Sequence, residues 1–230
     1  MHTSRLKLSS TLTPQPCVLL TGFDAFAGAV VNPSWLAVQT LDGESINGHV
    51  LVAAQLPTVF GSAAQVLARL LKRHKPALVI CTGQAAGRGA LSIERIAINV
   101  NDAFIADNSG DQPVDTPVVP GGPAAYFSTL PIKAMRLAIE QGGIAAEVSQ
   151  TAGTFVCNHV FYSLMHALAT QDAFKKTRGG FVHVPNLPGQ GLPDMALDEM
   201  VQGLRLAIAR ALITSGDTSG DITQSAGALS

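Results

Sequence analysis

Short apolar runs and amphipathic segments alternate along most of this chain. Residues 17–22, 49–56 and 77–82 are apolar runs that end at or just before Gly or Pro, the pattern of buried parallel strands. Segments with apolar residues three and four positions apart lie between such runs and predict helices packed on a core. The full prediction is strands over 17–22, 49–56, 77–82, 91–100, 145–149 and 180–184, and helices over 33–43, 62–74, 132–141, 156–169 and 194–213.

This alternation predicts an α/β fold: a single-domain open sandwich with a mostly parallel twisted sheet and helices on both faces. In such sheets ligands bind beyond the carboxyl ends of the strands, so the chemistry is expected there. The folded domain is predicted over 17–213, after a flexible extension (1–16) and before a Ser-, Thr- and Gly-rich disordered tail (214–230). Residues 102–122 predict either a long functional loop or a disordered segment.

Composition narrows the possible partners and location. The net charge is -1, without a long run of Lys or Arg, which argues against nucleic acid and anionic membranes as partners. No apolar run approaches the roughly 20 residues that a membrane-spanning helix needs, and no secretory signal is recognisable at the start. We therefore expect a cytoplasmic protein. Cys17, Cys81 and Cys157 are widely spaced and make no CxxC pair, so reduced thiols are expected, with no metal and no cofactor.

Cys157 is the first candidate for chemistry. It follows a Gly-containing turn in Thr151-Ala-Gly-Thr-Phe-Val-Cys-Asn-His159 and opens an amphipathic helix. The positive end of a helix dipole lowers a thiol pKa, and the N–H groups there can bind an oxyanion. A cysteine packed as a small hydrophobe is the open alternative.

A thiol nucleophile needs a base. The six histidines differ in where they lie in the predicted fold, and this difference selects one candidate. His183 lies near the end of the apolar strand Gly180-Phe-Val-His-Val-Pro185, where a parallel sheet delivers active-site side chains. Glu94 is a carboxylate inside an apolar strand, and a buried charge needs a partner. That partner is either Arg95 or a histidine from another strand, and spacing alone leaves both possible.

The glycine-rich segment Gly83-Gln-Ala-Ala-Gly-Arg-Gly89 follows a predicted strand. It matches neither a P-loop, which ends in Gly-Lys-Ser/Thr, nor the dinucleotide fingerprint, which leads directly into a helix. A turn that lines a pocket fits better, with Gln84 offering an amide to a polar ligand.

These blocks together closely resemble the type I pyroglutamyl peptidase family. The resemblance rests on Leu20-Thr-Gly-Phe-Asp-Ala-Phe26 with Asn32-Pro-Ser-Trp35, Gly83 to Asn99, Ser149 to His159, and Gly179 to Pro185. It implies peptides with an N-terminal pyroglutamyl residue as substrates, cytoplasmic location, and a homo-oligomer, either dimer or tetramer. It also implies a Cys157, His183 and Glu94 catalytic set, in which His183 is the base and Glu94 orients it.

The resemblance further implies a pocket for the flat lactam ring. Phe23 and Phe26 would contact the ring, joined by the side chains of Asn32, Gln84, Ile105 and Val156, with Arg88 supporting either the oxyanion or the pocket. The family commonly has Arg-Ile-Pro-Asp-Asn where this chain has Phe104-Ile-Ala-Asp-Asn108, and Gly where Ala27 stands. Two other hypotheses are a phosphorylase-like enzyme, because fold alone does not decide function, and a binder without turnover.

Overall fold

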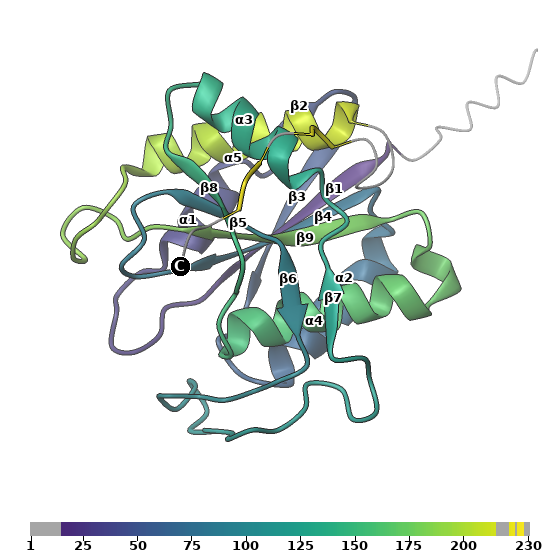
Figure 1. The fold of residues 1–230 in the computed structure, drawn as a ribbon, viewed down its shortest axis with the longest axis vertical. Helices are drawn as coiled ribbons and strands as arrows, with labels where there is room; N and C mark the ends of the chain where they lie inside the picture. The colour runs from purple at the N-terminus through teal and green to yellow at the C-terminus, as the bar shows by residue number, and fades with distance from the viewer. Residues whose placement is uncertain (1–14, 215–220, 224, 228–230) are drawn as a thin grey trace, which may run out of the picture.

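A central seven-stranded sheet organises the chain, of which the computed structural model describes residues 15–214, 221–223 and 225–227. The strand order is β2-β3-β1-β4-β9-β5-β8 (Figure 1). The strands of this sheet are β1 (Cys17–Phe23), β2 (Ser45–Ile46), β3 (His49–Leu56), β4 (Leu78–Gln84), β5 (Leu91–Glu94), β8 (Ala146–Ser149) and β9 (Arg178–Val184). The helices are α1 (Pro33–Thr40), α2 (Ser62–His74), α3 (Ile132–Gln141), α4 (Val156–Thr170), α5 (Leu197–Ile213) and the 3-10 turn η1 (Asp172–Phe174).

The sheet is mostly parallel, which confirms the predicted fold class. Strands β3, β1, β4 and β9 run parallel to one another, and β5 runs parallel to β8. The exceptions are β5, antiparallel to β9, and the two-residue β2, antiparallel to β3. The carboxyl ends of β1, β4 and β9 therefore meet at one edge, where ligands bind in this class of sheet.

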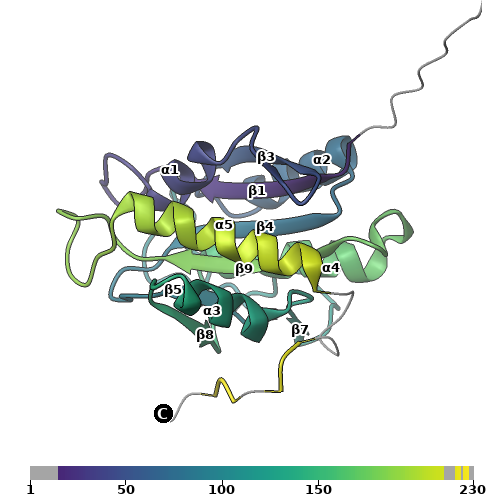
Figure 2. The ribbon, with the colours of Figure 1, turned by 90° about the horizontal axis from the view of Figure 1, so that it is seen from above.

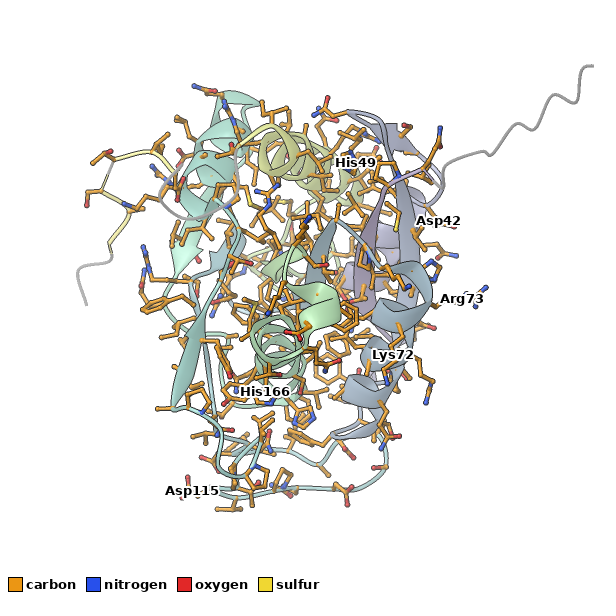
Figure 3. All side chains as sticks on the ribbon, turned by 90° about the vertical axis from the view of Figure 1, so that its right-hand side faces the viewer. Asp42, His49, Lys72, Arg73, Asp115 and His166 are labelled. Atoms are coloured by element: carbon orange, nitrogen blue, oxygen red, sulfur yellow. The ribbon has the colours of Figure 1, made fainter. Side chains whose placement is uncertain are left out.

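Helices cover both faces of the sheet, and the period-2 alternation of the strands separates two cores. Val18, Leu20 and Ile80 point to the core beneath α1, α3 and α5. Leu19 and Cys81 point to the other core, beneath α2 and α4. Figure 2 shows α3 and α5 lying along one side of the strands. On α2, Lys72 and Arg73 point outward, as expected for the polar face of an amphipathic helix (Figure 3).

Two differences from the sequence prediction concern the strand expected over residues 91–100 and the start of the last helix. The strand expected over residues 91–100 is divided: β5 ends at Glu94, and β6 (Ile96–Ile98) pairs with the unpredicted β7 (Ala125–Phe127) in a separate two-stranded sheet. The division falls at Arg95, whose N–H donates to the carbonyl of Ser149 in β8 and whose own carbonyl accepts from the N–H of Ser128, just after β7, so the chain passes here from one sheet to the other. Helix α5 begins at Leu197 rather than near residue 194, since Met195 N–H donates to the carbonyl of Asn186 and keeps this stretch extended.

The two predicted terminal segments, 1–16 and 214–230, lie mostly outside the described residues. Where the tail is described, the carboxylate of Asp221 accepts hydrogen bonds from the backbone N–H groups of Lys133 and Ala134 at the start of α3, at 2.9 and 2.8 Å. The sequence predicted no packing there. Among the described helices, none has the length and apolarity to cross a membrane.

Candidate active site

Three elements bring the predicted catalytic residues together near the carboxyl ends of β4 and β9. Cys157 is the second residue of α4, His183 is the sixth residue of β9, and Glu94 is the last residue of β5. Because β5 pairs with β9, Ser92 stands opposite His183, and Glu94, two residues further, points to the same face as Ser92.

Glu94 is fully buried, and its Oε1 atom has two partners. His183 Nδ1 lies 2.7 Å away, and the guanidinium Nη1 of Arg88 also lies 2.7 Å away. Since a carboxylate only accepts, His183 donates from Nδ1, and its Nε2 lone pair is left free. Arg95, the other partner considered from the sequence, instead donates to Gln150 Oε1. Burial of Glu94 thus fixes the tautomer and the orientation of His183.

Arg88 is anchored on three groups around this carboxylate. Besides Glu94, it donates to Ser149 Oγ at 3.2 Å and to the carbonyl of Thr151 at 2.9 Å. Its guanidinium therefore braces Glu94 against the turn that precedes α4. The other oxygen of Glu94, Oε2, is buried without a hydrogen-bond partner in the described part of the chain.

Cys157 sits above the strand pair that carries His183. Gly83 is the register partner of His183 in the β4–β9 pairing, so the two residues share a face of the sheet. A Cβ atom built on Gly83 would stand 2.6 Å from Cys157 Sγ. The sulfur therefore occupies the space beside His183 that any other residue at position 83 would fill. Among the described residues, no hydrogen bond joins Cys157 to His183, a common state of catalytic pairs before substrate binds.

The surroundings of Cys157 act on its thiol pKa in the direction opposite to the one expected from the helix dipole. Burial first, and then the charge of Glu94, raise the pKa of this thiol to about 12, against a smaller opposing effect of Arg88. The start of α4 has no side-chain cap. Its first N–H groups thus remain available to an anion beside the sulfur.

A small, mostly apolar pocket opens beside Cys157. Of the predicted binding residues, the structure brings five into its wall: Phe23, Phe26, Asn32, Gln84 and Val156. Thr58 and Phe155 also line it and were missed by the sequence analysis. The Thr-Phe-Val-Cys block places Phe155 two residues before Cys157, a signal that could have identified it.

Ile105 does not line this pocket. It lies on the long loop, with 39% of its surface exposed, next to Phe104, which is 97% exposed. In this structure Ile105 is therefore separate from the five predicted residues above.

The pocket wall is held by hydrogen bonds to Asp24, which lies between the two pocket phenylalanines in the sequence. Asp24 Oδ1 accepts from the N–H of Thr58 at 2.7 Å, and the carbonyl of Asp24 accepts from Asn32 Nδ2 at 2.9 Å. Asn32 Oδ1 accepts from the N–H of Ser34 and so caps α1. The N-terminus of α1 and the end of β3 are thereby fixed around the ring pocket.

The long loop predicted over residues 102–122 is anchored on this wall. Asp107 is buried and accepts hydrogen bonds from the N–H groups of Phe60, Ser109 and Asp111. Asn108 donates to the carbonyl of Ala25 at 2.8 Å. Figure 3 shows Asp115 at the outer end of the loop, away from the sheet. The loop is therefore an ordered part of the site and not a disordered segment.

His159, two residues after Cys157, has a structural position. His159 Nε2 accepts from the N–H of Gly61 at 3.2 Å, and its Nδ1 lies 2.9 Å from Asn101 Oδ1. Burial lowers the pKa of His159 to about 4, so the ring is neutral. Within the described ranges, no three His, Cys, Asp or Glu side chains form a group that could hold a metal ion.

Comparison with known proteins identifies relatives over nearly the whole described chain. The family model described as pyroglutamyl peptidase matches residues 17–214. A pyrrolidone-carboxylate peptidase of Cupriavidus taiwanensis is 57% identical over 207 residues, 88% of this chain and 95% of the relative. Pyrrolidone-carboxylate peptidase 1 of Ralstonia nicotianae is 58% identical over 202 residues, 86% of this chain and 93% of the relative.

Solved structures agree with this assignment. The crystal structure of pyroglutamyl peptidase I from Bacillus amyloliquefaciens superposes with a TM-score of 0.83 at 47% identity, covering 86% of this chain and 97% of that one. A mutant pyrrolidone carboxyl peptidase from Pyrococcus furiosus gives a TM-score of 0.81 at 42% identity, covering 85% and 97% of the two chains.

Proposed function

The chain belongs to the pyroglutamyl peptidase family of cysteine peptidases, which remove the N-terminal pyroglutamyl residue from peptides, and we propose that it acts through an acyl-enzyme on Cys157. His183 serves as general base and acid, and Glu94 orients His183. The observation that carries this proposal is the 2.7 Å bond from His183 Nδ1 to the buried Glu94, which leaves Nε2 on the face where Cys157 lies.

The first half of the reaction forms a thioester. His183 Nε2 takes the proton of the thiol while Sγ attacks the carbonyl carbon of the pyroglutamyl group. The oxyanion that develops is stabilised by the uncapped N–H groups at the start of α4. When the tetrahedral intermediate collapses, the C–N bond breaks and the leaving amine takes the proton from Nε2.

The second half uses the same groups with water as nucleophile. His183 Nε2 removes a proton from water, the resulting hydroxide attacks the thioester, and the C–S bond breaks. The products are free pyroglutamate and the protonated thiol. Because burial and the Glu94 charge raise the pKa of Cys157, we assign to His183 the removal of the thiol proton as Sγ attacks.

The pocket suits a flat, uncharged lactam ring. Phe23, Phe26 and Phe155 supply apolar walls, and Phe155 is itself packed edge-on against Phe60 with ring centroids 5.3 Å apart. Gln84 Nε2 is engaged by Asn186 Oδ1 at 2.8 Å, so its carbonyl oxygen is the group we assign to the lactam N–H. A linear glutamyl residue would bring a charged ammonium and carboxylate into this apolar wall and is disfavoured.

The decisive experiment measures release of a fluorescent amine from a pyroglutamyl amide under reducing conditions. We expect activity in the wild type, loss of at least about 10³-fold in Cys157→Ser, and retained activity in Cys17→Ser, a thiol on β1 remote from the pocket. Full activity in Cys157→Ala would exclude the proposed nucleophile. A wild type that binds but does not turn over would favour the non-catalytic alternative, and phosphorolysis of a nucleoside would revive the phosphorylase-like one.

Location and assembly are part of the same proposal. A free catalytic thiol is maintained in a reducing compartment, which is the basis for proposing the cytoplasm. A homo-oligomer, dimer or tetramer, is proposed from the family resemblance, and sedimentation of the purified chain tests it.

A further inference from the structure

A second hollow adjoins the ring pocket. It is lined by the loop after β1, residues 27–31, together with Gln84 and Gln190. Gln84 also lines the ring pocket, so one side chain forms the wall between the two spaces. The groove is the wider and more open of the two spaces. An amino-acid side chain can therefore lie along it without entering the ring pocket.

The lining of the groove is uncharged and largely aliphatic. Ala27, Gly28 and Ala29 form its floor with Val30 and Val31. Val30 is 93% exposed and Val31 is 38% exposed. Aliphatic side chains that stand in water beside a binding pocket gain free energy when an apolar group covers them.

Hydrogen bonds tie this loop to the strand that carries His183. Gln190, in the segment after β9, donates from Nε2 to the carbonyl of Val31 at 3.1 Å. Its Oε1 accepts from the N–H of Leu187 at 2.9 Å and from Gln84 Nε2 at 3.4 Å. The valines are thus held in a fixed position relative to His183, the residue that protonates the leaving amine.

We propose that this groove binds the residue that follows pyroglutamate in the substrate and selects an uncharged aliphatic side chain there. The inference rests on the proposed function. With the lactam ring in its pocket and its carbonyl carbon at Cys157, the peptide leaves through the mouth of the pocket. Gln84 lines both the pocket and the groove, so a peptide that continues past Gln84 meets the groove. Val30 and Val31 are the specificity-determining residues, and Gln190 is a positioning residue.

The test compares kcat/KM for three pyroglutamyl dipeptide amides that differ in the second residue: Leu, Asp or Lys. We expect the wild type to prefer Leu over both charged residues by about tenfold, the lower range for a hydrophobic subsite. Val30→Asp should lower the Leu/Lys ratio, and Val30→Lys the Leu/Asp ratio, each by about fivefold through the new charge pair. A general loss of structure would change the substrate ratios of both Val30 variants in the same way, so ratios that move in opposite directions exclude it.

Phe104→Asp is the matched control. Phe104 is similarly exposed but lies on the long loop, which is anchored by the hydrogen bond from Phe60 N–H to Asp107, and it does not line the groove. Its substitution should leave the three substrate ratios unchanged. Ratios that shift in Phe104→Asp, and not in the Val30 variants, would overturn the inference. If all three substrates are turned over and substitution of Val30 leaves their ratios unchanged, the groove inference fails and the proposed function stands. If neither these substrates nor a plain pyroglutamyl amide is turned over, the inference and the proposed function are both refuted.

Discussion

The sulfur of Cys157 lies so close above Gly83 that a single added methyl group would displace it: a Cβ on Gly83 would stand 2.6 Å from Sγ and 3.0 Å from the ring of Phe181. Only glycine at this point of β4 lets α4 bring Cys157, the proposed nucleophile, down to the sheet beside His183. The position of the Cys157 thiol therefore depends on Gly83 having no side chain.

Gly83→Ala is therefore expected to lower kcat/KM for a pyroglutamyl amide by about 100-fold, the effect of a misplacement near 1 Å. Gly227→Ala is the matched control, because a Cβ there meets no atom within 4 Å, and it should leave the rate unchanged. Steady-state kinetics with circular dichroism of both variants provide the measurement. Unimpaired catalysis in Gly83→Ala would mean that the sulfur works from another position.

The raised pKa of Cys157 predicts the pH dependence of its alkylation. An ordinary thiol is mostly ionised above about pH 9, and its reaction with iodoacetamide levels off there. Burial and the Glu94 charge raise the Cys157 pKa to about 12, so the rate should still increase between pH 9 and 10. The measurement uses Cys17→Ser with Cys81→Ala, so that only Cys157 reacts. A plateau already reached at pH 6 would instead indicate a preformed thiolate.

Arg88 should be needed to hold Glu94. Replacing it with Met removes the 2.7 Å ion pair and leaves a buried carboxylate with His183 as its one remaining partner. We expect the free energy of unfolding in urea to fall by about 3 kcal/mol and kcat to fall by at least about tenfold, with little change in KM. Arg95→Met removes the same type of side chain from the neighbouring position, where it contacts Gln150, and both quantities should change little.

The ionised side chain of Asp107 anchors the long loop, so we expect this anchor to weaken in acid. Burial opposes its charge, but hydrogen bonds from Phe60, Ser109 and Asp111 prevail and lower its pKa. This carboxylate therefore adds stability above its unfolded pKa of about 3.9, and the contribution is lost as pH falls through the lower folded pKa.

Asp107→Asn should consequently cost about 1–3 kcal/mol at pH 7, raise KM for a pyroglutamyl amide, and differ less from the wild type as pH falls below about 3.9. Urea unfolding at pH 7 and pH 3 measures the effect. Asp102→Asn, an exposed position in the same loop, should be neutral, and an equal loss in both variants would argue against a specific anchor.

His159 predicts a second, separate loss of stability in acid. Its pKa is lowered by burial to about 4, whereas the unfolded value is about 6.5. As pH falls below 6.5 the unfolded chain binds a proton that the folded chain does not, so stability is lost between about pH 6.5 and 4, by roughly 3 kcal/mol in total. His159→Gln should flatten this part of the stability curve. An unchanged slope would assign the acid sensitivity to other groups.

The order of strands and helices could be predicted from the sequence because it depends on local periodicity. The apolar runs at 17–22 and 77–82 became β1 and β4, and the run at 180–184 became the end of β9. The same reasoning placed Cys157 in the first turn of a helix and His183 near the end of a strand. The divided strand after Glu94 was not predictable, because Arg95 bonds through its backbone to Ser149 on one side and to Ser128 on the other, and both partners come from distant parts of the chain.

The sequence by itself determined the fold class, the family and the residues that carry the candidate chemistry. Tertiary structure decided which of them meet. The antiparallel pairing of β5 with β9 places Glu94 within hydrogen-bond distance of His183, and the arginine that pairs with Glu94 is Arg88 and not Arg95. It also decided that Thr58 and Phe155 line the pocket and that Ile105 does not. The physical reason is that neighbouring strands, buried charges and pocket walls join residues far apart in the chain, and local periodicity holds no information about which segments become neighbours.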